Sequence, residues 1–277
     1  MTAIKLPFAE PAPSNGEKAN ANWLVGVFQP TALFSLRASN ATSSGGKTLL
    51  VPSPYAVKVA LVDAAIRAAG LQSGKEIFAA VCACPIRMRP PRHAAVSNTF
   101  QRVLRQRRGG DNPGAAQESD GEGESGGGPY DRTIAYREVC HFAGTLAIAI
   151  GVEDLSATQR SLIAYTLAHI NYLGKRGSFM QFLRVQLVPE LPLGFSIPFD
   201  QRDLPSVNLD LYGLPQMLDD LGHDEGDLFD RINTYSSKRI TLDRERVARY
   251  TLLPYRRHAS TRHYTAYSRA AEITDDL

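Results

Sequence analysis

Cysteine is scarce in this sequence, and its scarcity argues against two classes of protein. The 277 residues contain only Cys82, Cys84 and Cys140, an odd number without the spacing of a disulfide framework. The Cys82 and Cys84 pair also lacks the second pair of ligands that a structural zinc site requires. We therefore interpret all three as small buried side chains of a protein from a reducing compartment.

Long apolar runs are missing as well. No stretch approaches 18 consecutive apolar residues, and the N-terminal MTAIKLPFAEPAPSNGEK has neither the apolar region nor the cleavage signal of a secretory leader. We predict that residues 1–21 form a flexible leader and that the protein is soluble and cytoplasmic.

Familiar catalytic and cofactor motifs are absent too. The sequence has no G-x-S-x-G and no H-E-x-x-H. GGKT (45–48) does not fit a phosphate-binding P-loop, because the leading glycine would fall at Ala41 and LLVPSP follows Lys47 instead of a helix. The acidic run DDLGHDEGD (219–227) is interpreted as a solvated loop, not a two-metal site. We predict no metal and no cofactor.

Charge is small in total but segregated along the chain. The 31 Lys and Arg exceed the 28 Asp and Glu by only three. However, residues 86–108 contain seven arginines and no acid, residues 109–129 contain acids and no base, and residues 231–269 are again strongly basic. This segregation indicates a face that binds a polyanion. Aromatic residues among the arginines favour single-stranded RNA, and the alternative is a solvated charged hairpin.

The clearest helix signal is VPSPYAVKVALVDAAIRAAG, at residues 51–70. Ser53 is a good N-cap, Pro54 suits the first turn, and Gly70 suits the position after the last turn. The Ser- and Gly-rich segment that carries Arg37 and Lys47 leads to the N-terminal end of this helix, which attracts anions. The predicted apolar stripe is Val57, Ala60, Leu61, Ala64 and Ala68, widened by Ala65 and Ile66.

The order of the predicted elements indicates an α+β fold of the ferredoxin-like, split βαβ type. Strands are predicted at 23–28, 80–88, 145–152 and 179–188, and a second helix is predicted from the capping box of Ser156 and Gln159 to about residue 172, ended by Gly174. The predicted body spans residues 22–190. Residues 92–140 are inserted into it as a basic thumb hairpin with a disordered tip at 109–129. Residues 191–277 form either a second, smaller lobe or an irregular wrapped extension.

Two further segments combine glycine or aromatic residues with positive charge. GKRGSF (174–179) places Lys175 and Arg176 between two glycines and can hold a phosphate, and the alternative is a plain turn. YTLLPYRRHASTRHYTAY (250–267), with Tyr255 near its centre, can bind RNA or dock a partner protein.

Together, SLRAS, PSPYAVKVALVDAAIRAAG, YREVCHFAGTLAIAI and YLGKRGSF resemble the Cas "five" family, the RAMP-type subunit of type I CRISPR effector complexes (Cascade). The resemblance covers about residues 23–188. It implies a ferredoxin-like body with an arginine-bearing thumb. It also implies a non-catalytic role in which the protein caps the 5′ handle of the guide RNA (crRNA), contacts the backbone and large subunits, and meets target DNA only indirectly.

By this resemblance and the surrounding charge we predict an RNA-binding set and no catalytic residue. The alternative is a metal-independent endonuclease for precursor guide RNA that uses His141 or His169. The predicted RNA-binding residues are Arg37, Lys47, Tyr55, Arg102, Arg105, Arg107, Arg108, Arg132, Tyr136, Arg137, Lys175, Arg176 and Ser178.

Overall fold

The computed structural model describes residues 22–39, 45–106, 130–199, 207–222 and 226–274. The predicted leader (1–21) and hairpin tip (109–129) lie outside these ranges. The described residues form a mixed α/β fold. None of their helices is both long enough and apolar enough to cross a membrane.

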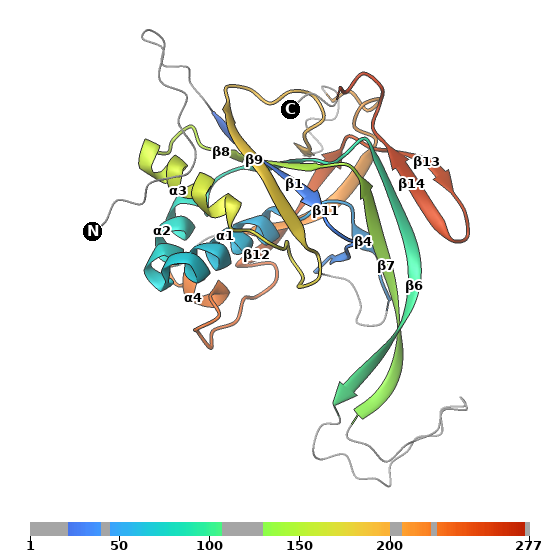
Figure 1. Ribbon diagram of the computed structural model, residues 1–277, viewed down its shortest axis with the longest axis horizontal. Helices are drawn as coiled ribbons and strands as arrows, with labels where there is room; N and C mark the ends of the chain where they lie inside the picture. The colour runs from blue at the N-terminus through green and yellow to red at the C-terminus, as the bar shows by residue number, and fades with distance from the viewer. Residues whose placement is uncertain (1–21, 40–44, 107–129, 200–206, 223–225, 275–277) are drawn as a thin grey trace.

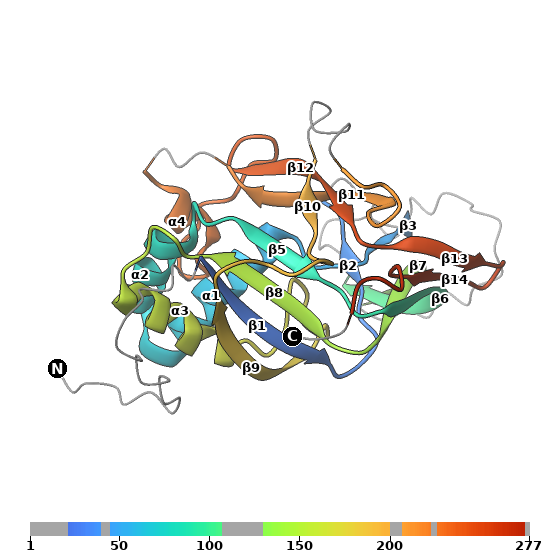
Figure 2. The same cartoon turned by 90° about the horizontal axis from the view of Figure 1, so that it is seen from above.

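A four-stranded sheet forms the centre of the fold (Figures 1 and 2). Its order is β5, β8, β1, β9, and every neighbouring pair is antiparallel. Its strands are β1 (Trp23–Pro30), β5 (Ile86–Arg89), β8 (Leu146–Gly151) and β9 (Met180–Val188). Helices α1 (Pro54–Ala69) and α2 (Leu71–Val81) come between β1 and β5, and α3 (Ala157–Ala168) comes between β8 and β9.

Alternation along the strands gives this sheet two buried sides. Leu24 and Phe28 of β1 belong to the main core, with Leu61 of α1 and Leu167 of α3. The intervening side chains point to the side of the sheet without helices, where a smaller cluster contains Val25, Val27, Ala147, Ala149 and Phe195.

Helix α1 has the predicted caps. The Ser53 hydroxyl accepts a hydrogen bond from the Ala56 N–H at 3.2 Å, and Gly70 ends the helix with φ 86°. The predicted stripe is wrong at two places. Ala68, which belongs to it, is exposed, and Lys58, which lies outside it, is only 2% exposed. The helix buries a wider surface than an amphipathic pattern shows, because strand β11 (Leu214–Leu221) covers a second side of it.

The strand prediction for residues 80–88 is wrong in its first half. Helix α2 was not predicted, and it runs to Val81, so that the strand occupies only Ile86–Arg89. An apolar run of this length does not distinguish a buried helix end from a strand.

Helix α3 begins as predicted but ends early. Both hydrogen bonds of the Ser156 and Gln159 capping box are present. The helix ends at Ala168 rather than near residue 172, so Gly174 does not terminate it and lies instead in the loop that follows.

A long hairpin leaves the body and projects away from it (Figure 1). It consists of β6 (His93–Gln106) and β7 (Tyr130–Ala143), paired in unbroken antiparallel register, and we call it the arm. Strands β13 (Arg256–Ser260), β14 (Tyr264–Ser268) and β3 (Gly45–Gly46) extend its base into a five-stranded sheet. Strand β2 (Leu36–Arg37) pairs with β4 (Thr48–Leu49) beside it.

The C-terminal region shares the core of the body. Strands β10 (Ile197–Pro198), β12 (Arg246–Leu253) and β11 form a sheet in that order, and the short helix α4 (Leu228–Ile232) follows β11. Leu218, Leu228 and Tyr255 belong to the same buried cluster as α1 and the central sheet. The described part of residues 191–277 therefore packs as one body with residues 22–190.

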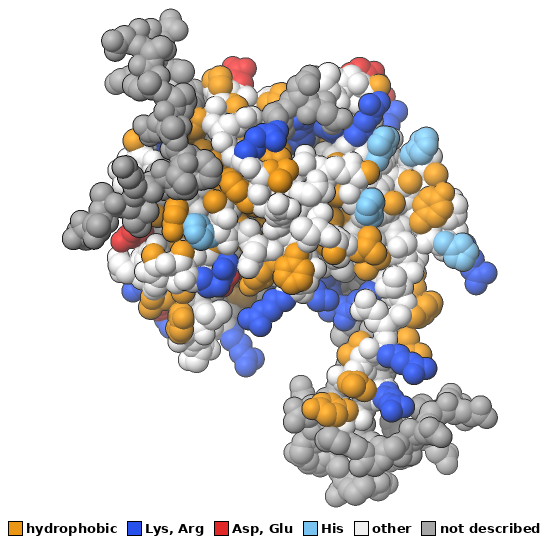
Figure 3. Space-filling view, in the orientation of Figure 1, with side chains coloured by type: hydrophobic (Ala, Val, Ile, Leu, Met, Phe, Trp, Pro, Cys, Tyr) orange, Lys and Arg blue, Asp and Glu red, His pale blue; other side chains and the backbone are white. Residues whose placement is uncertain are grey.

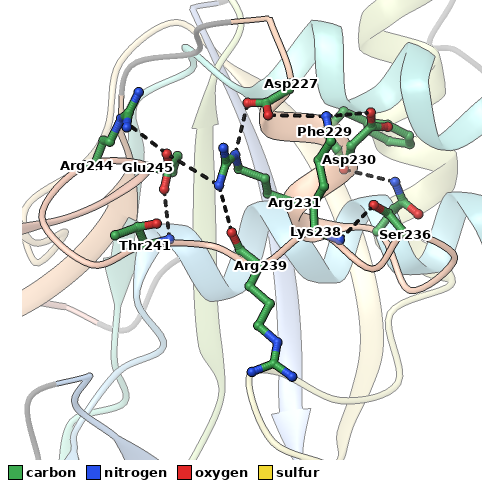
Figure 4. A network of polar contacts seen from close by, with 11 residues as sticks. Asp227, Phe229, Asp230, Arg231, Ser236, Lys238, Arg239, Thr241, Arg244 and Glu245 are labelled. Atoms are coloured by element: carbon green, nitrogen blue, oxygen red, sulfur yellow. Dashed lines mark hydrogen bonds and ion pairs between the residues drawn. The ribbon is translucent and has the colours of Figure 1, made fainter.

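Helix α4 is held by a network of charged groups (Figure 4). Arg231 contacts Asp227 at 3.0 Å and Glu245 at 3.8 Å, and its guanidinium also donates to the Arg239 carbonyl. The hydrogen bond from Arg231 lowers the pKa of Asp227. The acidic run at 219–227 is therefore not a plain solvated loop: its first residues, Asp219 and Asp220, lie in β11, and Asp227 is an anchor of α4.

Replacing Lys58 tests how strongly α1 and β11 depend on each other. Its ammonium donates to the Asp220 carboxylate at 2.8 Å and to the Cys82 carbonyl at 2.9 Å. Lys58→Met leaves both acceptors without this donor, so we expect the free energy of unfolding in urea to fall by about 3–5 kcal/mol. Arg67→Met removes the more exposed pair with Asp63 on the same helix and should cost less than about 1 kcal/mol. Equal losses would contradict this assignment.

Candidate nucleic-acid interface

A cavity of about 330 Å³ lies at the N-terminal end of α1. Three of its lining side chains are residues predicted from the sequence: Arg37 from β2, Tyr55 from α1, and Lys175 from the loop after α3. Tyr172 and Arg246 line it as well. We call this the α1 cavity, and it brings together residues that lie more than 200 positions apart in the chain.

Tyr55 is held in a charged setting. Arg246 stacks on its ring, with the guanidinium carbon 4.3 Å from the ring centroid. Burial raises the pKa of Tyr55, and the nearby charges of Arg246 and Asp219 act in opposite directions on it. The phenol is therefore neutral near pH 7 and offers both a ring face and an O–H donor.

Arg246 is oriented by a buried carboxylate. Its Nε lies 3.0 Å from the Asp219 Oδ2, and the Ser39 hydroxyl donates to the other oxygen of Asp219 at 2.8 Å. Asp219 is 5% exposed, so this bond is shielded from water. No specific signal in the sequence pointed to Arg246, which is one of many basic residues in the stretch at 231–269.

The glycine-bounded turn forms another wall of the α1 cavity. Gly174 and Gly177 have φ of 71° and 101°, and the Ser178 N–H donates to the Lys175 carbonyl at 2.9 Å. This fold of the loop leaves Lys175 and Arg176 exposed. Ser178 is only 2% exposed, so in this structure it supports the turn and does not face solvent.

Residues 45–49 connect the α1 cavity to the arm. Gly45 and Gly46 pair in parallel with Tyr136 and Arg137 of β7, and Thr48 pairs with Arg37 of β2. The Glu138 carboxylate accepts a hydrogen bond from the Thr48 N–H at 2.9 Å. Lys47 lies between these strands and is exposed. GGKT therefore consists of strand β3, Lys47 and the first residue of β4, with no helix directly after it, in agreement with the failed P-loop match.

One face of the arm combines arginines with exposed apolar side chains. Phe100, Arg102 and Leu104 occupy alternate positions of β6, and in register they face Tyr136, Ile134 and Arg132 of β7. Phe100 is 76% exposed, Ile134 67% and Leu104 63%. The Phe100 and Tyr136 rings meet edge to face at 5.2 Å.

The remaining arm arginines are placed differently. Arg137 lies on the opposite face, beside Thr99, and is half-buried. Arg105 lies opposite Asp131 in the strand register, near the end of the described hairpin. Arg107 and Arg108 lie outside the described residues. Figure 3 shows Lys and Arg side chains along the edge of the body next to the arm and on the arm itself.

Two other predicted groups do not reach this interface. Tyr255 is fully buried, and its hydroxyl donates to the Pro91 carbonyl at 2.7 Å, so it cannot stack on RNA. His141 lies on β7 and His169 follows α3, and within the described chain neither lines the α1 cavity. The described residues contain no group of three or more His, Cys, Asp or Glu that could hold a metal ion.

Comparisons place this geometry beside known proteins. No protein-family model matches the chain. A curated protein of Archaeoglobus fulgidus, described as CRISPR-associated protein Cas5, is 25% identical over 171 residues, which cover 61% of this chain and 67% of that protein.

Two solved structures also align with the chain over most of its length. The crystal structure of a CRISPR protein from Archaeoglobus fulgidus has a TM-score of 0.43 and 13% identity, covering 90% of this chain and 92% of that one. A chain of a CRISPR RNA-guided surveillance complex has a TM-score of 0.37 and 15% identity, covering 91% and 92%.

Gly174 and Gly177 offer a matched test of the turn. An alanine at either position must adopt a positive φ, which costs about 1–2 kcal/mol. A Cβ at Gly174 would also lie 3.1 Å from Leu36 Cδ2, whereas a Cβ at Gly177 meets open space. We expect Gly174→Ala to lower the free energy of unfolding more than Gly177→Ala does, in parallel urea titrations. An equal or smaller loss would show that the turn does not depend on contact with β2.

Proposed function

We propose that this chain, a member of the Cas5 family of CRISPR-associated proteins, is a non-catalytic, cytoplasmic subunit of a type I Cascade. In this role it caps the 5′ handle of the guide RNA. The α1 cavity is the observation that carries this proposal. It gathers a tyrosine, a stacked arginine and two further cations from four separate elements.

The arrangement of the central sheet supports a ferredoxin-like body. The strand order in the sheet is β5, β8, β1, β9. Along the chain, helices lie between β1 and β5 and between β8 and β9, which fits the split βαβ pattern. We propose that the arm is the thumb, inserted between β5 and β8, and that residues 191–277 are an extension wrapped onto the body.

RNA binding would use two kinds of contact. In the α1 cavity a base can stack on Tyr55 or on the Arg246 plane, while Arg37 and Lys175 contact phosphates. On the arm, Arg102 and Arg132 can contact the backbone of the same strand. Residues 45–49 hold the two surfaces in a fixed relation, since they pair with both β2 and β7.

The apolar part of the arm points to protein partners. Phe100, Leu104 and Ile134 are exposed beside one another, which is costly in an isolated protein and typical of an interaction surface. We propose that the backbone subunit covers part of this face and that the large subunit contacts the body.

A salt titration tests the arm. Each phosphate contact on a single strand contributes about 0.7 to the slope of log K against log salt. We expect Arg102→Gln and Arg132→Gln each to reduce the slope for handle RNA by about this amount. Lys75→Gln, an exposed change on α2, should leave the slope unchanged. If the arm variants behave like the Lys75 control, the arm does not contact RNA phosphate.

A pair of substitutions at one position tests stacking in the α1 cavity. Tyr55→Leu removes the ring, and we expect it to weaken RNA binding by about 1–3 kcal/mol, roughly 5- to 150-fold. Tyr55→Phe keeps the ring and should stay within a few-fold of the unchanged protein. Thermal melting of both variants controls for folding. If both variants bind like the unchanged protein, Tyr55 is not a stacking platform.

Incubation of the same proteins with end-labelled repeat RNA in EDTA tests the non-catalytic part of the proposal. We expect no site-specific product. A discrete product that is lost in His141→Ala or His169→Ala would establish the endonuclease instead.

A further inference from the structure

The α1 cavity contains one acid among its basic residues. Asp63 is the only Asp or Glu among the described residues that line it, whereas Arg37, Lys175 and Arg246 contribute positive charge. A carboxylate repels the phosphates of a nucleic acid, so attraction between charges does not explain its place here. A carboxylate does accept hydrogen bonds from the amino groups of bases. Asp63 therefore suits the base of a nucleotide and not its phosphate.

The α1 cavity runs along the helix, and its two ends differ in charge. Tyr55, Val59 and Asp63 follow one another at intervals of four residues, so all three lie on one side of α1. At a rise of about 1.5 Å per residue, Asp63 lies about 12 Å further along the helix than Tyr55. We call the part near Tyr55 and Arg246 the cation end and the part near Asp63 the acid end. Val59 and Ala60 form the wall between them.

The loop after α3 forms the facing wall and runs in the opposite direction to α1. A Cβ at Gly174 would lie 3.8 Å from the Ala56 Cβ, in the first turn of the helix. Nearer the start of the loop, the His169 carbonyl accepts a hydrogen bond from Arg67, in the last turn, at 3.2 Å. Tyr172 lies between these two contacts in the sequence and also lines the cavity. Its ring therefore lies towards the acid end, and the glycine-bounded turn lies at the cation end.

The Asp63 carboxylate is held in position by Arg67. The Nε of Arg67 donates to Asp63 Oδ2 at 2.9 Å, and its Nη2 donates to the His169 carbonyl. Within the described chain this is the only hydrogen bond that Asp63 makes, so both carboxylate oxygens keep lone pairs that can accept further donors. The side chain is 30% exposed, which leaves it within reach of a ligand. An acceptor that is already oriented loses little conformational entropy when a base binds.

We propose that Asp63 makes the α1 cavity selective for guanine. Guanine is the RNA base whose pairing edge offers two adjacent donors, the N1–H and the N2 amino group, and these match the two oxygens of a carboxylate. Adenine and cytosine offer one amino group beside an acceptor nitrogen. Uracil places its N3–H between two carbonyl oxygens, which a carboxylate repels.

The rest of the nucleotide fits the same polarity. With its base at the acid end, the guanosine nucleotide places its phosphate towards the cation end, where a neighbouring base can still stack on Tyr55. This inference rests on the proposed function for the source of the nucleotide, which is an RNA strand.

Guanosine 5′-monophosphate tests the cavity without any assumption about RNA. In the full chain labelled with ¹⁵N, we expect it to cause saturable shifts of the Ala60 and Gly174 amide signals. It should bind about 5- to 150-fold more tightly than uridine 5′-monophosphate, the range expected for a bidentate contact to a base. Inosine 5′-monophosphate, which lacks the N2 amino group, should fall between the two. No saturable shift, or equal binding of the guanosine and uridine nucleotides, would overturn the site.

Asp63→Asn is the decisive variant. The amide keeps the size of the side chain but replaces one acceptor oxygen with a donor, so we expect the preference for guanosine over uridine to disappear and uridine binding to persist. Glu76→Gln makes the same chemical change at an exposed acid of α2 and should keep the preference. Thermal melting of both variants controls for folding. A preference that survives Asp63→Asn, or that Glu76→Gln removes equally, would overturn the assignment.

An oligouridylate of about eight nucleotides with one central guanosine tests whether the nucleotide belongs to RNA. We expect it to bind more tightly than the uniform oligouridylate, by a factor that Asp63→Asn removes. A preference among free nucleotides without one among these RNAs would overturn the RNA assignment. Selectivity for guanosine without specific binding of handle RNA would reject the proposed function and keep this role of Asp63. Binding of handle RNA without any selectivity for guanosine would reject this inference alone.

Discussion

The ion pair between Lys58 and Asp220 is the contact on which the geometry of this protein depends. It joins α1 to β11, and its ammonium also bonds to the carbonyl of Cys82, just after α2. Strand β11 in turn sets β12, since Leu221 pairs with Arg246. The position of Arg246 over Tyr55 is therefore fixed by a bond between two segments 162 residues apart. This bond therefore stabilises the wall of the α1 cavity that Arg246 forms, together with the pairing of β11 with β12.

The same arrangement explains how a chain with a net charge of only +3 can present a basic surface. Asp219, Asp227 and Glu245 each face an arginine of the C-terminal part of the fold, and Asp220 faces Lys58 of α1, so these acids stabilise contacts between elements. Five further acids lie in the segment at 109–129, which joins the two strands of the arm in sequence. Exposed basic residues therefore remain on the arm, such as Arg102 and Arg132, and on the turn, at Lys175 and Arg176, although the totals nearly cancel.

Local signals predicted the parts of this fold that local interactions determine. The caps of α1 and the capping box of α3 were predicted because they involve residues three or four apart. Helix α2, the burial of Lys58 and the inward turn of Tyr255 were missed, because each depends on a partner distant in sequence. In the candidate site the predicted Arg37, Tyr55 and Lys175 do meet, but Arg246 could be found only from the pairing of β11 with β12.

The side chains that line the α1 cavity suit different parts of a nucleotide. Tyr55 offers a ring and Arg246 is already paired with Asp219, so these two contribute shape and stacking more than net charge, whereas Arg37 and Lys175 add positive charge. A strand that ran from this cavity along the arm would be read in the cavity and only held at Arg102 and Arg132. Such a division lets one end of an RNA be recognised while the chain that continues from it can have any sequence.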